Sequence, residues 1–269
     1  MSIEALGCED SPSPKPANSS RVGLIVPSSN TTMETELPEL FARQSAATGH
    51  RYTFHSARAA MKRVTKAELD AMVDKAADCA VAVSDADVDV IAYACLVAVM
   101  AQGPGAHVGS EKVLTEAAEG NGHPAAVVSS AGALVRTLRA LGAGRVAIVT
   151  PYMQALTQTV REYIEGEGVE VVDAVSLEVD DNLAVGRLDP SRLPDIARGL
   201  RREGAEALVL SACVQMPSLA AVQQVEDELG LPVVTAATAT TFELLQSLGH
   251  QPAIAGAGRL LSAGLPAAS

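Results

Sequence analysis

The chain has 269 residues and carries 20 lysine and arginine residues against 32 aspartate and glutamate residues, giving a formal net charge of −12. Such an acidic surface repels phosphate backbones and anionic lipid headgroups, so we expect neither a nucleic-acid partner nor a membrane partner. Aromatic residues make up only 3% of the chain and tryptophan is absent, which also argues against a platform for stacking bases.

Residues 1–20 are rich in proline and serine and show no hydrophobic periodicity, so we predict a disordered N-terminal extension. The N-terminus lacks a basic flank followed by an apolar core, and no apolar run reaches the roughly 18 residues of a membrane span. We therefore expect a cytoplasmic protein with thiols rather than disulfides. Cys8 lies in the extension and Cys79 in a predicted helix, and we expect neither to take part in chemistry.

Strands and helices alternate from residue 21 onward. The predicted strands span 21–26, 51–57, 88–94, 125–128, 145–150, 169–176, 206–212 and 232–235. The predicted helices span 33–45, 66–84, 110–119, 130–141, 153–166, 191–203, 218–229 and 237–248. Most strands are continuous runs of Val, Ile, Ala and Leu, which is typical of parallel sheets covered by helices on both faces.

Three strand ends recur in the same order in the two halves of the chain. Arg21–Pro27 resembles Arg145–Pro151, the run ending at Cys95 resembles the run ending at Cys213, and 127–129 resembles 233–235. This series indicates an internal duplication into two pseudo-symmetric flavodoxin-like α/β lobes, each with a four-stranded parallel sheet. We assign 21–128 plus 235–269 to the N-terminal lobe and 129–234 to the second, with the active site in the cleft between them.

Cys95 and Cys213 are the leading candidates for chemistry, because each follows a predicted strand of one half. Ligands of open parallel sheets bind at the carboxyl ends of the strands, and a thiolate there can act as nucleophile or base. None of the five histidines is an obvious local partner for either thiol. A lone buried cysteine is most often inert core, but the repeat-matched pair favours a functional role.

Five short polar residues, 28–32, lie between the first strand and the first helix. The exposed N–H groups and dipole of a helix N-terminus attract anions, whereas a simple helix cap needs only one such residue. We therefore predict a site for a carboxylate or phosphate. No phosphate-binding glycine loop and no metal-ligand motif is present, so we expect neither a nucleotide nor a metal.

Three further features are candidates for the same site. The apolar, glycine-flanked segment 96–105 is expected to form a loop that closes over a small substrate, or alternatively a helix-capping turn. Tyr152 follows the first strand of the second lobe, where it either donates to a substrate oxygen or packs. Asn182 follows the next strand and can bind a carboxylate.

Residues Val26–Glu34, read as Val-Pro-Ser-Ser-Asn-Thr-Thr-Met-Glu, closely resemble the N-terminal signature of the maleate cis-trans isomerases. That family belongs to the aspartate/glutamate racemase superfamily, together with hydantoin racemases and arylmalonate decarboxylases. The resemblance covers residues 21–250, and the cysteine pair fits the superfamily. Decarboxylase relatives keep only one of the two thiols, so the pair counts against that branch.

The resemblance implies a cofactor-independent isomerisation of maleate, a small cis-dicarboxylate, to fumarate. We expect a homodimer, because compact two-lobed enzymes are often homodimers. Cys95 would be the nucleophile that adds to the double bond, and Cys213 the acid/base partner. Residues expected to bind the substrate are Asn30, Tyr152 and Asn182, accompanied by Ser28, Ser29, Thr31, Val97 and Val214.

Two other functions stay open at this point. A cofactor-independent amino-acid or hydantoin racemase would use the two cysteines as acid and base across a stereocentre, but the Ser/Asn/Thr segment offers no evident partner for an ammonium group. A non-enzymatic solute-binding protein would also hold a ligand between two α/β lobes, but it would need an export signal and no thiol pair.

Overall fold

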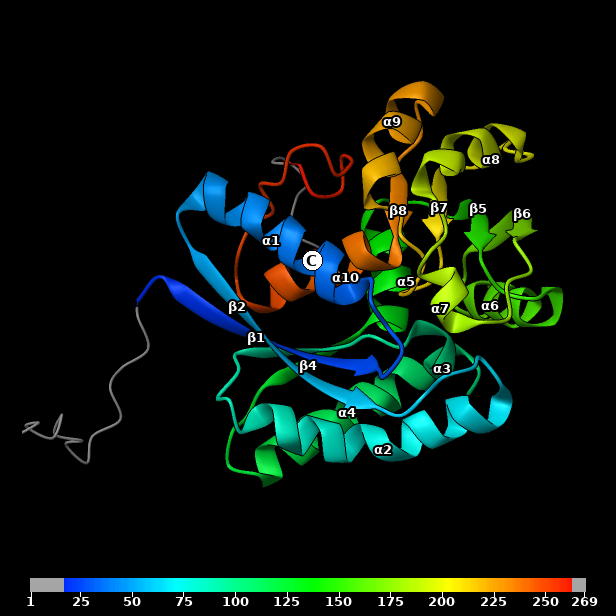
Figure 1. The fold of residues 1–269 in the computed structure, drawn as a ribbon. Coiled ribbons are helices and arrows are strands. Elements are labelled where there is room, and N and C mark those ends of the chain that lie inside the picture. Colours follow the sequence, from blue (N-terminus) through cyan, green and yellow to red (C-terminus); the bar gives the residue numbers. More distant parts are fainter. Residues whose placement is uncertain (1–16, 263–269) are drawn as a thin grey trace, which may run out of the picture.

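A computed structural model describes residues 17–262 of the protein. Two four-stranded parallel sheets, each flanked by helices, build the molecule (Figure 1). The first sheet has the order β2-β1-β3-β4, with β1 (Ser19–Pro27), β2 (Arg51–Ala59), β3 (Val90–Tyr93) and β4 (Ala126–Ser129). The second has the order β6-β5-β7-β8, with β5 (Arg145–Thr150), β6 (Glu170–Ser176), β7 (Ala207–Ser211) and β8 (Val233–Thr235).

The helices alternate with these strands. In the first half they are α1 (Met33–Thr48), α2 (Lys66–Ser84), α3 (Leu96–Met100), α4 (Ala106–Gly120) and α5 (Ser130–Ala140). In the second half they are α6 (Gln154–Gly166), α7 (Asn182–Val185), the 3-10 turn η1 (Pro190–Arg192), α8 (Leu193–Gly199), α9 (Leu219–Leu229) and α10 (Ala236–Ser247).

The burial of the strands explains why the sequence forms them. Every residue of the central strands β3 and β7 is buried, because helices cover both faces of each sheet. β2 lies at an edge of its sheet, and most of its residues are exposed or half-buried. The continuous apolar runs in the sequence thus mark the central strands, as predicted.

The two sheets have the same strand order when β5–β8 are laid over β1–β4. In each lobe the first strand is central and pairs in parallel with the second and third strands. This repetition confirms the predicted fold class of two matching flavodoxin-like lobes.

α10 follows the last strand of the second sheet and contacts α1, α5, β3 and β4, as well as β8 (Figure 1). The contacts with α1, β3 and β4 agree with the proposed division in which the chain returns to the first lobe after residue 234, whereas α5 and β8 belong to the proposed second lobe. The expected start of the ordered chain at residue 21 is wrong by at least two residues. Ser19 and Ser20 belong to β1, where Ser19 pairs with Arg51. The rest of the predicted extension up to residue 16, including Cys8, lies outside the described residues.

The segment after Cys95 differs from its prediction. We expected residues 96–105 to form a loop over the substrate, but Leu96–Met100 form α3, and all five of its residues are buried. This short helix packs against α2, α4, α5 and α6. Its apolar side chains are therefore part of the core, and the helix cannot act as a mobile cover. The predicted helix 191–203 is also shorter, since η1 and α8 together end at Gly199.

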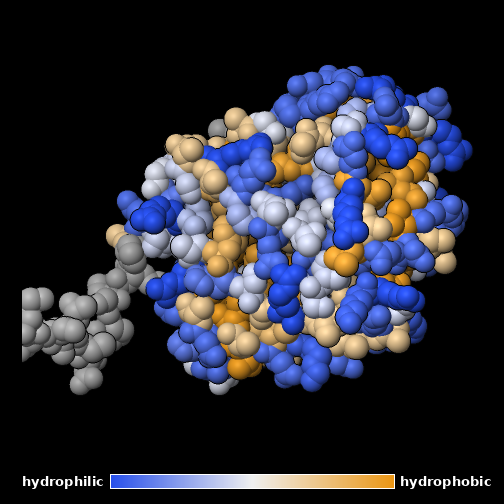
Figure 2. All heavy atoms as spheres, viewed as in Figure 1, coloured by the Kyte–Doolittle hydropathy of each residue, from blue (hydrophilic) through white to orange (hydrophobic). Residues whose placement is uncertain are grey.

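The surface in view is mainly polar, with apolar residues gathered in small patches (Figure 2). Within residues 17–262, no helix is both long and apolar enough to cross a membrane.

Candidate active site

The strand order places the candidate residues at two equivalent positions. In each lobe the order reverses between the first and third strands, and ligands of such sheets bind beyond the carboxyl ends at this switch point. In the first lobe these ends lead to the segment 28–32 and to Cys95, and in the second to Tyr152 and Cys213. The fold therefore gives each lobe one thiol at its ligand-binding edge, together with the polar segment 28–32 in the first lobe and Tyr152 in the second.

Cys95 is fully buried and stands directly before α3 as its N-cap residue. Burial raises the pKa of this thiol to about 12, while a hydrogen bond from the backbone of Ala98 lowers it and the charge of Cys213 raises it further. The last effect shows that the two sulfur atoms, which come from different lobes, lie within electrostatic reach of each other.

Cys213 is buried as well, with 4% of its surface exposed. Burial raises its pKa, whereas hydrogen bonds from the Tyr152 hydroxyl and from the backbone N–H groups of Gln215 and Met216 lower it. The Gln215 N–H lies 3.3 Å from the Cys213 sulfur. Cys213 thus has three donors that favour the thiolate, where Cys95 has one.

Tyr152 joins the two thiols. Its ring is buried, and its pKa is raised by burial first and then by the charges of Cys213 and Cys95. Since the phenol bonds to one thiol and feels the charge of the other, the predicted trio of Cys95, Cys213 and Tyr152 does come together in space.

Asn30 both caps a helix and bridges the lobes. Its Oδ1 atom accepts the N–H groups of Thr32 and Met33, at 3.1 and 3.0 Å, at the start of α1. Its Nδ2 atom donates to the carbonyl oxygen of Val214, at 3.0 Å, directly after Cys213. The capping interpretation of the polar segment is therefore correct for Asn30, and the same side chain also reaches the second thiol loop.

Asn182 makes the reciprocal contact from the second lobe. It begins α7, is 3% exposed, and donates from Nδ2 to the hydroxyl of Ser29 at 2.7 Å. Ser29 in turn donates to the carbonyl oxygen of Met61 at 2.5 Å. The structure thus brings Asn30, Ser29 and Asn182 to one boundary between the lobes, as expected for residues of a shared site.

Ser28, Thr31 and Val97 occupy less central positions. Ser28 is exposed, and its hydroxyl accepts the N–H of Met61 at 3.0 Å. Thr31 is exposed, and Val97 is buried within α3. The hydroxyl of Ser28 and the N–H group of Thr31 hydrogen-bond to the protein itself. Contact of Ser28, Thr31 and Val97 with substrate stays a prediction.

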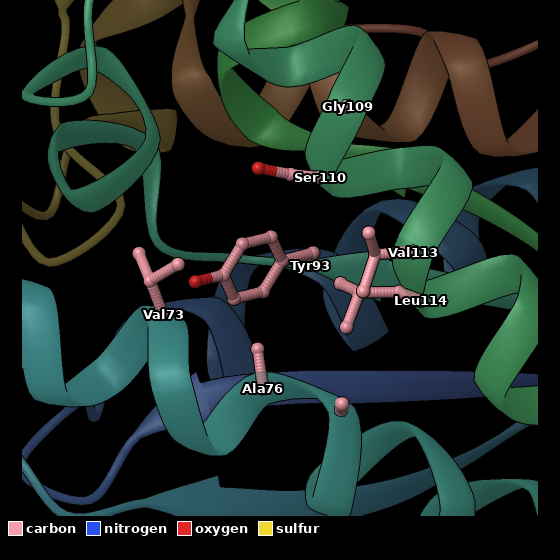
Figure 3. Close-up of a pocket in the computed structure, with 8 residues that line it drawn as sticks. Val73, Ala76, Tyr93, Gly109, Ser110, Val113 and Leu114 are labelled. Atoms are coloured by element: carbon pink, nitrogen blue, oxygen red, sulfur yellow. The ribbon is translucent and has the colours of Figure 1, made fainter.

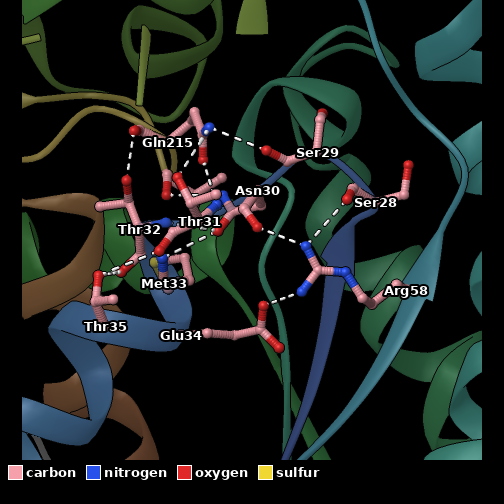
Figure 4. A network of polar contacts seen from close by, with 11 residues as sticks. Ser28, Ser29, Asn30, Thr31, Thr32, Met33, Glu34, Thr35, Arg58 and Gln215 are labelled. Atoms are coloured by element: carbon pink, nitrogen blue, oxygen red, sulfur yellow. Dashed lines mark hydrogen bonds and ion pairs between the residues drawn. The ribbon is translucent and has the colours of Figure 1, made fainter. Parts of the chain in front are cut away.

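Two residues that the sequence did not single out hold the polar segment in place. Arg58 on β2 donates to the carbonyl oxygens of Ser28 and Asn30, at 3.0 and 2.6 Å. Gln215 accepts the N–H of Thr31 at 2.9 Å (Figure 4). A single amide inside the apolar run Val214–Met216, next to the second cysteine, was the available signal for Gln215.

The described part of the chain contains no group of three or more His, Cys, Asp or Glu side chains that could hold a metal ion. A separate cavity of about 230 Å³ lies between α2 and α4 and is lined by Tyr93 and Ser110 among others (Figure 3). Neither Cys95 nor Cys213 lines it, so it is distinct from the site between the lobes.

Two matching α/β lobes that each contribute one buried thiol define a protein of the aspartate/glutamate racemase superfamily. The arylmalonate decarboxylase family model matches residues 22–261. A maleate isomerase of Geobacillus stearothermophilus is 53% identical over 243 residues, covering 90% of this chain and 97% of the relative. The chain therefore belongs to the maleate isomerase family, and it is an enzyme.

Solved structures agree with this assignment. The maleate isomerase Iso from Pseudomonas putida S16 superposes with a TM-score of 0.90 at 49% identity, covering 91% of this chain and 99% of that one. A cysteine-to-serine variant of the Nocardia farcinica maleate cis-trans isomerase, with a covalently bound succinylcysteine intermediate, gives a TM-score of 0.88 at 46% identity. The latter comparison covers 91% of this chain and 99% of the Nocardia chain.

Proposed function

We propose that the protein converts maleate to fumarate without a cofactor, and that Cys95 adds covalently to the double bond. The observation that carries this proposal is the burial of two thiols at matching strand ends of the two lobes, beside the contacts that Asn30 and Asn182 make between the lobes. The succinylcysteine in the Nocardia relative supports the covalent step. A succinyl thioether is what results when a thiol adds across the double bond of a butenedioate.

The chemistry requires the double bond to become single for a short time. The Cys95 thiolate forms a carbon–sulfur bond to one alkene carbon, and the π electron pair moves to the neighbouring carbon and its carboxylate. That carbon accepts a proton, the carbon–carbon bond rotates, and loss of the same proton and expulsion of the thiolate give fumarate. No electrons are gained or lost overall, so the reaction needs no oxidant or reductant.

Cys213 is the group we assign to proton transfer. It has three hydrogen-bond donors that stabilise its thiolate, and the charge of that thiolate raises the pKa of Cys95. Cys213 therefore ionises first and can take the proton of Cys95. The neutral Cys213 thiol then delivers this proton to the carbanion and recovers it after the rotation.

The amide groups of Asn30 and Asn182 are suited to hold the substrate carboxylates. Each Nδ2 atom uses one N–H group in a contact to the protein, to Val214 or to Ser29. Each has a second N–H group available for a carboxylate oxygen. Donors of this kind in a site shielded from water also stabilise charge that develops on the carboxylate during addition.

The test is a fumarate assay on purified protein in the presence of a chelator and without added cofactor. We expect turnover by the wild type, a loss of at least about a hundredfold in Cys95→Ser and Cys213→Ala, and no change in Cys79→Ser, which alters a half-buried cysteine of α2. Near-native turnover by Cys95→Ser would rule out covalent addition. Racemisation of aspartate, glutamate or a hydantoin in place of isomerisation would favour the racemase alternative.

We further propose that the enzyme is a cytoplasmic homodimer, and light scattering on the purified protein tests its oligomeric state.

A further inference from the structure

We propose that Gln215 is a positioning residue that fastens the polar segment of the first lobe to the thiol loop of the second, and thereby keeps both thiols away from water. The shielding of the thiols by Gln215 does not depend on the proposed function, whereas the expected effect of Gln215 on turnover rests on it. It begins from the burial of Cys95 and Cys213, which means that a substrate reaches them only after contacts between the lobes have separated.

The side-chain amide of Gln215 has no spare hydrogen-bonding group. Its Oε1 atom accepts the N–H of Thr31 at 2.9 Å, and its Nε2 atom donates to the carbonyl oxygen of Ser29 at 3.1 Å (Figure 4). The same Nε2 atom donates to the carbonyl oxygen of Asn182 at 2.9 Å. One amide thus joins the segment after β1, the start of α7 and the loop after β7. Both N–H groups are needed, so an acceptor of the same shape cannot replace it.

The backbone of the same residue extends this connection to the sulfur. Its N–H lies 3.3 Å from Cys213 Sγ, and its carbonyl oxygen accepts the hydroxyl of Thr32 at 2.7 Å. The groups that hold the first lobe and one of the three donors that stabilise the Cys213 thiolate therefore belong to one residue. Separation of the lobes at Gln215 would disturb the environment of Cys213 at the same time.

The end of α7 leaves room for this amide only because residue 186 is glycine. A Cβ atom at Gly186 would lie 2.5 Å from Gln215 Nε2 and 2.8 Å from Thr31 Oγ1. The φ angle of Gly186 is −66°, which any residue adopts, so space and not backbone conformation is what requires glycine. Gly186→Ala therefore offers a second way to displace the amide without touching Gln215.

The experiment measures the alkylation rate of each cysteine by iodoacetamide, resolved by mass spectrometry of the peptides. The variants are Gln215→Ala, Gln215→Glu and Gly186→Ala, with Gln224→Ala on the exposed face of α9 as the matched control. Loss of two or three neutral hydrogen bonds predicts about a 10- to 100-fold faster alkylation of Cys95 and Cys213 in both Gln215 variants. Gly186→Ala is expected to move both rates in the same direction.

Cys79 serves as an internal reference, since it lies in α2 and is only half-buried. If Gln215 positions the site, the Cys79 rate stays constant while the other two rise. Unchanged rates at Cys95 and Cys213, or a parallel rise at Cys79 that indicates general loosening, would overturn the proposal.

Turnover separates this inference from the proposed function. We expect the Gln215 variants to raise KM for maleate and lower kcat, because the closed site forms less often, and Gln224→Ala to keep both. Faster alkylation in a protein whose wild type makes no fumarate would retain the positioning role and refute the proposed function. Fumarate formation with unchanged alkylation would support the proposed function and refute the positioning role of Gln215.

Discussion

Tyr152→Phe tests the proton-transfer assignment most directly. The change removes only the hydroxyl that hydrogen-bonds to Cys213, and it leaves the buried ring in place. The hydroxyl lowers the pKa of Cys213, so its loss raises that pKa and leaves less thiolate at neutral pH. Cys213 keeps its backbone donors from Gln215 and Met216, so we expect a partial loss of activity.

The size of the effect follows from the kind of bond that is lost. A hydrogen bond to a charged group contributes about 1.5–3 kcal/mol, which corresponds to roughly a 10- to 150-fold change in the equilibrium between thiol and thiolate. We therefore expect kcat/KM for maleate at neutral pH to fall by about this factor, and the ascending limb of its pH profile to move to higher pH. The pH profile of kcat/KM is the appropriate measurement, because it reports ionisations of the free enzyme.

Tyr163→Phe is the control. Tyr163 lies in α6 of the same lobe and bonds to His107 at 2.5 Å instead of to a thiol, so its pH profile should match the wild type. A Tyr152→Phe variant with an unmoved ascending limb would show that Cys213 does not carry the proton that limits the reaction.

Two further predictions concern stability. Glu36 of α1 accepts the N–H groups of Ser218 and Leu219, at 2.6 and 2.8 Å, at the start of α9. Glu36→Ala leaves both buried donors unpaired and should cost about 2–4 kcal/mol in urea unfolding, more than the exposed Glu39→Ala. Burial lowers the pKa of His107, so its neutral form contributes stability above its ordinary pKa of 6.5, and this is lost as pH falls toward the lowered value. His107→Asn should flatten this decrease in the free energy of unfolding, measured by urea unfolding at a series of pH values. An unchanged slope would show that other groups cause the decrease.

The sequence was sufficient to predict the sheets because burial on both faces leaves a direct trace in composition. β3 and β7 are entirely buried, and apart from the terminal Ser211 of β7 they read as uninterrupted apolar runs. α3 left no such trace, since a five-residue apolar run is too short for periodicity to distinguish a helix from an extended segment. The duplication likewise allowed Cys95 and Cys213 to be paired before their positions in space were known.

The contacts between the lobes were beyond sequence analysis. Asn30 and the carbonyl oxygen of Val214 are 184 residues apart in the chain, and nothing in either local pattern indicates the other. The polar segment 28–32 looked like a group of donors for an anion, but much of its hydrogen-bonding capacity serves the partner lobe. Which donors stay available for a substrate depends on the three-dimensional contacts, and composition does not determine them.

Burial of a thiol opposes its reactivity, and a second buried thiol changes how the protons leave the site. A single buried cysteine stays neutral, because desolvation disfavours the thiolate. When two such groups interact, the first to ionise makes the second harder to ionise, and the protons leave the pair one at a time. Here the charge of Cys213 raises the pKa of Cys95, so after one proton has left the pair the other is held more tightly. Addition to a double bond requires a thiolate that attacks one alkene carbon and a proton for the neighbouring carbon. A coupled pair of thiols that retains a single proton supplies the thiolate and the proton.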